Sequence, residues 1–299
     1  ISHTGVHDHG FNIVSTYGNL RRFILEEKSG VNSSDLAVCE MALKLSGAVQ
    51  AMRYSMSETG KGYIYSFNGP HSLFADTIRS MRALLLSHHL GHELIGEAEV
   101  HINLLHRALE HAETTAAFNV YFGEGRDSYD VPGRVVHESI FNTNDGKYRC
   151  PSTQQGYSPF TTWTRGASWV ILGVAEMLEF FQSVSDEEFS SSGGREAVQK
   201  RYEQVLQATC DYYIDGYTCK DGIPFWDEGA PGLVNLPDYQ SQDSDPYNQY
   251  EPVDSSAAAI TAQGLIRYGK YLESQGNAKA NRYIQAGLTV AGTLFSEPY

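Results

Sequence analysis

The sequence predicts an all-α fold of the α/α-barrel (toroid) type. Helical periodicity recurs along the chain, the helical segments follow one another in antiparallel-looking pairs, and strand-like pattern is confined to one short hairpin. In such a barrel the helices pair, and the loops at one rim build the site. We count about eight helices where a barrel of six pairs has about twelve, so we expect it to be incomplete at one or both ends of this chain. No composition shift marks a boundary, and we expect a single domain over 1–299.

Four helical segments are expected in the first half of the chain. A helix over 14–27 follows a histidine-rich turn, and a second, over 32–52, begins at the capping signal Asn-Ser-Ser-Asp. After a loop, a third helix over 73–90 places its apolar residues on one face. The fourth, over 94–122, is long and amphipathic.

The pattern changes near residue 123 and becomes helical again after residue 159. Two strand-like runs, 134–141 and 147–150, flank an Asp145-Gly146 turn, which predicts a β-hairpin insert. The remaining segments are helices over 165–184 and 195–216, an irregular stretch over 217–252, and two helices that begin at Asp254 and near Asn277.

Composition narrows the partners of the chain. With 22 basic and 36 acidic residues, the formal net charge is −14, which argues against broad binding of nucleic acid or of anionic membranes. No apolar run approaches membrane-spanning length. The four cysteines form no C-x-x-C pair, so we expect free thiols rather than disulfides. The chain begins at Ile1 without a signal sequence, and the compartment stays open.

The segment 137–166 is rich in amides, rings and hydroxyls, and it leads into a helix. These side chains on irregular backbone suit a pocket for a polar, ring-shaped, negatively charged ligand. Trp163 is the better stacking candidate, whereas Trp169 fits a core position. Arg165 stands at a helix start, where the dipole prefers acids, and an anionic ligand would resolve that conflict. His137 has a plain alternative as a surface strand residue.

Two acidic residues are candidates for chemistry. Asp8 lies in a His-Asp-His-Gly turn before a helix, and Asp76 lies in the first turns of the third helix. The alternative for both is a structural role, as acids that complement a helix dipole. If both helices begin at one common site, the two acids suit a hydrolase that acts on a sugar. One carboxyl can act as general acid and base, while the other binds the sugar or stabilises positive charge. His88 and His92 share a helical face, but a helix end that favours cationic histidines explains them more simply than a metal.

Three stretches together resemble glycoside hydrolase family 88, the unsaturated glucuronyl hydrolases. They are HDHGF around Asp8, the helix that carries Asp76, and QQGYSPFTTWTRGASW from Gln154 to Trp169. The resemblance runs from the first residues to about Ile260. The family usually has an Asn and a Pro after this Asp, where this chain has Ser80 and Arg82. Segments at both ends of family members have no counterpart here, so we expect an internal portion of a longer protein.

The resemblance implies an (α/α)6 barrel and an enzyme that hydrates the C4=C5 vinyl ether of a 4,5-unsaturated uronic acid at the non-reducing end of lyase-generated oligosaccharides. Asp76 would protonate C4 and then activate water, with Asp8 as the second essential carboxylate. The positions that would hold the sugar are His7, His137 and Gln155 as contacts, Trp163 as a stacking ring and Arg165 as the ligand of its carboxylate. No metal or organic cofactor is implied.

The expected partner is therefore an unsaturated uronyl oligosaccharide of glycosaminoglycan or ulvan type, bound by a monomer or weak oligomer. The nearest alternative is the sister family acting on unsaturated rhamnogalacturonyl disaccharides. Alternatives of another class are an α/α-toroid polysaccharide lyase and a non-catalytic glycan-binding protein.

Overall fold

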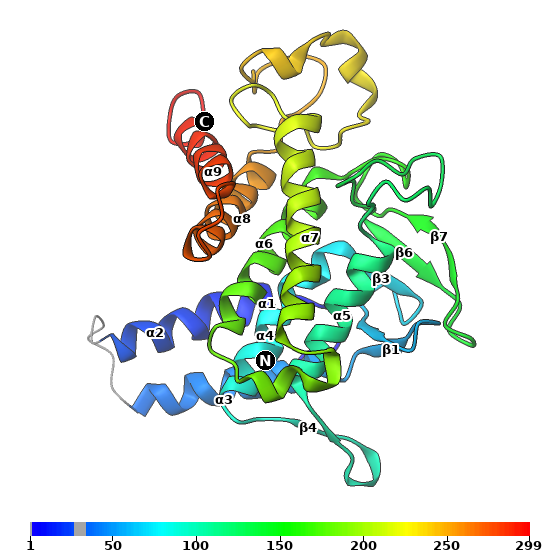
Figure 1. Ribbon diagram of the computed structural model, residues 1–299, viewed down its shortest axis with the longest axis vertical. Helices are drawn as coiled ribbons and strands as arrows, with labels where there is room; N and C mark the ends of the chain where they lie inside the picture. Colours follow the sequence, from blue (N-terminus) through cyan, green and yellow to red (C-terminus); the bar gives the residue numbers. More distant parts are fainter. Residues whose placement is uncertain (1, 27–33) are drawn as a thin grey trace. The chain divides into compact units, whose positions relative to one another are not determined.

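A computed structural model describes residues 2–26 and 34–299 (Figure 1). The described chain divides into two compact units, one of Ile1–Thr115 with Ile140–Arg149 and one of Ala116–Ser139 with Cys150–Tyr299. Helices dominate both, and the strands are short. The α-helices are α1 (His9–Ile13), α2 (Asn19–Leu25), α3 (Ser34–Ala51), α4 (Met81–His89), α5 (Leu104–Phe118), α6 (Thr164–Phe181), α7 (Arg195–Tyr212), α8 (Ser255–Ser274) and α9 (Ala280–Leu294).

The strands are β1 (Tyr54–Met56), β2 (Gly62–Ile64), β3 (Ser72–Phe74), β4 (Leu94–Ile95), β5 (His101–Ile102), β6 (Glu138–Phe141) and β7 (Tyr148–Ser152). The short 3-10 helices are η2 (Ala75–Ser80), η3 (Glu97–Glu99), η4 (Asp186–Ser192), η6 (Pro231–Asn235) and η7 (Tyr239–Ser241). The π-helical turns are η1 (Val14–Gly18) and η5 (Tyr213–Tyr217). The expectation of a single domain over 1–299 stays a prediction.

The first unit packs α1 to α4 around a small core. Val14, Leu43 and Ala83 are buried together, so one residue each from η1, α3 and α4 forms its centre. The first expected helix starts earlier than predicted, at His9, and continues through the π-helical turn into α2. Its predicted last residue, Glu27, and the first two residues of the capping signal before α3 lie outside the described residues.

Two helix predictions in this unit were wrong at their N-terminal ends. The expected helix over 73–90 is strand β3, then η2, then α4, because the apolar pair that opens it lies in a strand next to β6 in a sheet. Just before β3, the amide of Phe141 donates to the carbonyl of His71 at 2.8 Å. A short apolar run does not distinguish strand from helix. The expected helix over 94–122 begins only at Leu104, because β4 and β5 form an antiparallel hairpin whose connection holds Ala98 at φ 55°. The loop expected before residue 73 was wrong in part, because β2 within it forms an antiparallel hairpin with β1.

The predicted hairpin insert is present. The amide of Asn142 donates to Lys147 and that of Gly146 to Asn142, which closes the turn between β6 and β7, and the strand order is β3-β6-β7. Gly146 has φ 69°, and a Cβ there would lie 2.8 Å from the carbonyl carbon of Ser57. The turn therefore requires glycine for both conformation and space.

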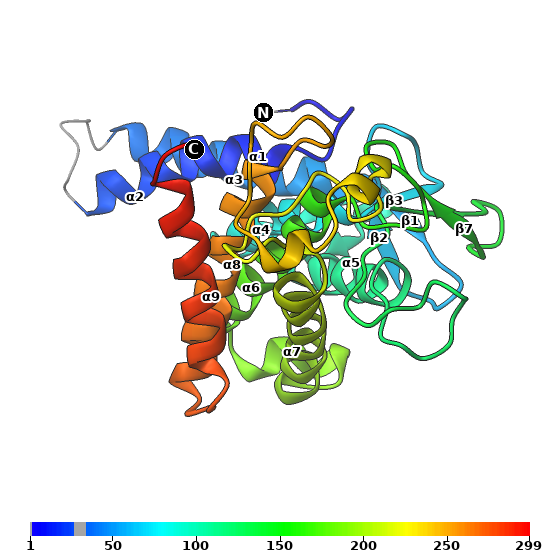
Figure 2. The ribbon, with the colours of Figure 1, turned by 90° about the horizontal axis from the view of Figure 1, so that it is seen from above.

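The second unit is built on four long helices, all predicted. α6 packs against α7 and α8, and α8 against α9, and Figures 1 and 2 show α8 and α9 side by side in orange and red. α8 starts at the predicted residue, because the carboxylate of Asp254 caps it by accepting from the amide of Ala257 at 2.8 Å. All four cysteines are free, as predicted. None of the helices in the described ranges is long and apolar enough to cross a membrane.

Candidate active site

The turn that opens α1 places His7 and Asp8 in the first unit. The carbonyl of Asp8 accepts the amides of Phe11 and Asn12, whereas its side chain makes no capping hydrogen bond. Asp8 therefore stands at the N-cap position of α1 without capping the helix through its side chain, and its alternative as an acid that complements the helix dipole stays open. Gly10 is required here, because a Cβ would lie 2.3 Å from the Cα of Ser80. α1 thus lies directly against η2, the 3-10 helix that carries Asp76.

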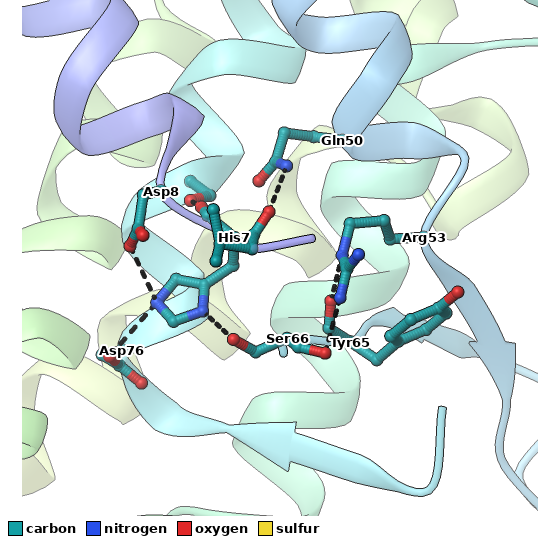
Figure 3. Close-up of polar contacts among 9 residues, drawn as sticks. His7, Asp8, Gln50, Arg53, Tyr65, Ser66 and Asp76 are labelled. Carbon is teal, nitrogen blue, oxygen red and sulfur yellow. Dashed lines mark hydrogen bonds and ion pairs between the residues drawn. The ribbon is translucent and has the colours of Figure 1, made fainter. Parts of the chain in front are cut away.

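His7 joins the two carboxylates (Figure 3). Its Nε2 lies 3.2 Å from Oδ2 of Asp76 and 3.6 Å from Oδ1 of Asp8. On the other side of the ring, Nδ1 contacts the hydroxyl of Ser66. His7 is buried, with 4% of its surface exposed. Three of the residues predicted for the site, His7, Asp8 and Asp76, therefore form one cluster within this unit.

The electrostatics of the cluster favour a proton on His7. Burial of the imidazole would lower the pKa of His7, and Arg53 acts in the same direction. The carboxylates of Asp76 and Asp8 outweigh both, so the pKa of His7 is raised above its ordinary value of 6.5. A buried histidine with its Nε2–H between two carboxylates can hold and return a proton near neutral pH.

The two acids differ in accessibility. Asp76 lies in the first turn of η2 directly after β3, and its side chain is 11% exposed, whereas the Asp8 side chain is 43% exposed. A carboxyl shielded from water is the better general acid, because its protonated form is not penalised by burial. A carboxylate open to solvent is better suited to contact ligand hydroxyls.

Sequence reasoning missed the residues that hold this turn in place. The hydroxyl of Ser80 donates to the carbonyl of His7, and Nε2 of Gln50 donates to the carbonyl of Val6 at 3.0 Å. Nε of Arg82 donates to the carbonyl of Gly10 at 2.5 Å. Ser80 and Arg82 are the two departures from the family pattern, and both bind the turn that carries His7 and Asp8.

A second cluster, in the second unit, centres on His137. This residue is 3% exposed, so its alternative as a surface strand residue was wrong. Its Nδ1 accepts the amides of Gln154 at 3.0 Å and Gln155 at 3.3 Å, and lies 3.2 Å from the hydroxyl of Thr153. Since Nδ1 is an acceptor, the ring proton is assigned to Nε2. The side chain of Gln155 is exposed.

Trp163 and Arg165 belong to the same cluster. The Trp163 ring lies 4.6 Å from the His137 ring, and the Arg165 guanidinium lies 5.6 Å from the Trp163 ring. Trp163 is buried at 5% exposure, while Trp169, expected in the core, is only half-buried. The Trp163 ring is thus covered mainly by protein, and its stacking role stays a prediction.

Arg165 already has an anionic partner. Its Nε and Nη2 both donate to Oδ2 of Asp254, at 3.1 and 3.0 Å. From the sequence, we expected an anionic ligand to compensate the unfavourable position of the Arg165 cation at a helix start. In the structure Asp254, the capping residue of α8, supplies that negative charge. The Arg165 side chain is still 41% exposed, so it remains accessible.

Two acids absent from the sequence predictions anchor the loop before α6. Asp227 is fully buried and accepts the amides of Tyr157 and Gly229, each at 2.9 Å. Burial raises the pKa of Asp227, with hydrogen bonds from these amides acting in the opposite direction. Glu228 accepts the amide of Thr162 at 3.0 Å. No sequence signal marks these acids, because their partners in the loop, Tyr157 and Thr162, lie 70 and 66 positions earlier in the chain.

Residues 2–26 and 34–299 contain no group of three or more His, Cys, Asp or Glu side chains that could hold a metal ion.

Comparisons with known proteins point to one family. No family model matches the sequence. An unsaturated glucuronyl hydrolase of Formosa agariphila is 24% identical over 241 residues, which cover 76% of this chain and 49% of that protein. The unsaturated glucuronyl hydrolase of Bacillus sp. strain GL1 is 26% identical over 158 residues, covering 53% of this chain and 33% of that protein. The chain thus spans at most about half the length of these curated relatives.

Solved structures show the fold of the chain. An unsaturated glucuronyl hydrolase specific for heparin superposes with a TM-score of 0.69 at 18% identity, covering 99% of this chain and 63% of that chain. The likeness shows the fold, and the predicted all-α class of the α/α-barrel type is confirmed. The resemblance of this chain to the unsaturated glucuronyl hydrolases, glycoside hydrolase family 88, is therefore confirmed by relatives in sequence, and the solved structure shares its fold.

Proposed function

We propose that this chain carries the catalytic residues of a glycoside hydrolase that removes a 4,5-unsaturated uronic acid from the non-reducing end of lyase-generated oligosaccharides. The observation that carries the proposal is His7 held between the carboxyl groups of Asp76 and Asp8, at the positions where the resemblance places the reacting acids. The names of the relatives in sequence and structure support it.

The reaction begins with protonation of C4. The substrate has a C4=C5 bond beside the ring oxygen, which is a vinyl ether. The carboxyl of Asp76 gives its proton to C4, and positive charge develops at C5, where the ring oxygen shares it. Asp76 is then a carboxylate beside the Nε2 of His7, 3.2 Å away. This placement stabilises the carboxylate through the imidazole.

Water completes the reaction. It adds to C5 and loses a proton to the Asp76 carboxylate, which restores the acid. The resulting hemiketal opens, the bond to the neighbouring sugar breaks, and that sugar is released. Asp8, the more exposed carboxylate, is proposed to contact the sugar hydroxyls and to support the charge at C5.

The second cluster is proposed to bind the sugar. Arg165 keeps part of its guanidinium accessible while Asp254 holds it, which suits it to the uronic carboxylate. His137 offers its Nε2–H and Gln155 its exposed amide as hydrogen-bond partners. Trp163 is proposed to line this subsite beside them. The protein is proposed to need no metal or organic cofactor.

The substrate class is proposed from the relatives. One solved neighbour is specific for heparin, and the Bacillus enzyme is responsible for the degradation of glycosaminoglycan. We therefore propose glycosaminoglycan-derived unsaturated disaccharides as first substrates. A monomeric or weakly oligomeric state stays a prediction.

The test is the ultraviolet absorbance of the C4=C5 bond conjugated with the carboxylate. Mixing the protein with unsaturated disaccharides from heparin is expected to abolish that absorbance. A rise with intact polymer would instead identify a lyase, and binding without any change would identify a glycan-binding protein. Loss only with unsaturated rhamnogalacturonyl disaccharides would move the chain to the sister activity.

A further inference from the structure

The side of His7 that faces away from the acids has a partner that the proposed reaction does not use. Nδ1 of His7 contacts the hydroxyl of Ser66, which is fully buried (Figure 3). The two residues are 59 positions apart. A buried hydroxyl placed against a histidine nitrogen decides which protons the ring can carry, because there is no water to replace it.

Arg53 fixes the position of Ser66. Its Nη2 donates to the carbonyl of Ser66 at 2.5 Å, and its Nε donates to the carbonyl of Tyr65 at 2.8 Å. The guanidinium also lies 4.5 Å from the centre of the Tyr65 ring, and the amide of Tyr65 donates back to the carbonyl of Arg53 at 3.0 Å. This segment is therefore held by four contacts with one buried arginine, and the Ser66 hydroxyl has a defined place.

The chemistry of a hydroxyl matters at this position. A protonated imidazole donates from both nitrogens, and a hydroxyl can accept the Nδ1–H. When the Nε2 proton moves to the carboxylate of Asp76, 3.2 Å away, Nδ1 keeps its proton and its bond to Ser66. One N–H bond breaks and one O–H bond forms, and no other group has to rearrange.

We propose that Ser66, fixed by Arg53, is a positioning residue that keeps the proton on Nδ1 of His7, so that the Nε2 proton is the one exchanged with Asp76. This inference rests on the proposed function, in which Asp76 alternates between carboxyl and carboxylate beside Nε2 of His7. Ser66 acts only through His7 and does not touch the substrate.

Among the charged and titratable neighbours of His7 that the structure describes, only the two carboxylates can take its proton. The charged or titratable groups that act on it are Asp8 beside it, Asp76 on η2 and Arg53 at the end of α3. His111 of α5 is the fourth. Its Nδ1 accepts the amide of Ile64 at 3.0 Å, and complete burial, with His7 adding to it, lowers the pKa of His111 to about 3. His111 therefore stays neutral and does not compete for the proton.

The test compares Ser66→Ala with Ser87→Ala. Ser87 is a matched control, because it is equally buried in the same unit and its hydroxyl also makes one hydrogen bond, to the carbonyl of Lys44 at 2.8 Å. We expect Ser66→Ala to lower kcat about tenfold with KM changed less than about twofold, and to shift the pH profile of kcat. Ser87→Ala should leave the profile where it is in the unchanged protein.

Nitrogen NMR of the imidazoles, with His7 assigned from the spectrum of His7→Asn, gives a readout without substrate. In the unchanged protein Nδ1 of His7 should be protonated both below and above the raised pKa of the ring, whereas in Ser66→Ala the neutral ring should lose that proton. An unprotonated Nδ1 in the unchanged protein overturns the inference, even if Ser66→Ala does not fold. If the protein fails to hydrolyse unsaturated disaccharides, the proposed function fails, but the spectrum still decides the role of Ser66.

Discussion

The two histidine clusters, one in each unit, hold their rings in opposite ways. Nε2 of His7 faces two carboxylates and Nδ1 faces a hydroxyl, so every neighbour can accept a hydrogen bond from the ring. Nδ1 of His137 instead faces two backbone amides, which can only donate. The first arrangement favours a ring that gains and loses a proton, and the second favours a neutral ring with one fixed donor. The first suits reaction, and the second suits binding.

The largest effect is expected from breaking the reactive cluster. Asp76→Asn keeps the shape of the side chain but removes the proton donor, so we expect kcat to fall about a thousandfold. Circular dichroism should show the helical content unchanged. The control is Asp243→Asn, which makes the same change at an exposed residue of the second unit. More than a tenth of the original kcat in Asp76→Asn would remove this residue from the mechanism.

The binding cluster should respond in KM rather than kcat. We expect Arg165→Ala to raise KM about thirtyfold, because one charged hydrogen-bonding group to the sugar carboxylate is lost, and to change kcat little. Arg267→Ala is the control, since Arg267 pairs with Glu179 in the same unit at similar exposure. Thermal unfolding should be measured in parallel, because Asp254 loses its partner in Arg165→Ala. An unchanged KM would rule out the carboxylate role.

A pair of variants separates the two nitrogens of His137. His137→Asn keeps an acceptor near the place of Nδ1, whereas His137→Phe leaves the amides of Gln154 and Gln155 without one. We expect His137→Phe to lower the free energy of unfolding by about 2 kcal/mol and His137→Asn by about half as much. Both should raise KM about tenfold. Urea denaturation measures the first effect, and equal destabilisation by the two variants would contradict the acceptor role.

The smallest effect is a pH dependence of stability. The folded-state pKa of His7 is raised, so protonated His7 stabilises the fold; this contribution is complete below about pH 6.5 and is lost as the pH rises through the raised pKa. The free energy of unfolding of the unchanged protein should therefore fall over that window relative to His7→Asn. Parallel curves for the two proteins would show that the proton on His7 does not contribute.

Much of the second unit could be predicted from the sequence. The four long helices have strong periodicity, and the cap of α8 is a local signal within four residues. The first unit was harder, because β3 and β4 are short apolar runs. β3 lies next to the distant strand β6, and β4 pairs with β5 in a two-residue ladder. The reaction chemistry came from the family motif, since neither Asp8 nor Asp76 differs locally from an ordinary acid at a helix start.

By itself the sequence determined the helical class, the hairpin turn at Gly146, the excess of negative charge and the residue types available for chemistry. Only the tertiary structure decided which of them meet. Ser66 reaches His7 across 59 positions, and Arg165 reaches Asp254 across 89. The physical reason is that caps and turns are made by neighbours in the chain, whereas contacts over such separations form only when packing closes the intervening loops. His7 and His137 are therefore the same residue type in the sequence, and their different hydrogen-bonding roles come only from their surroundings in the folded chain.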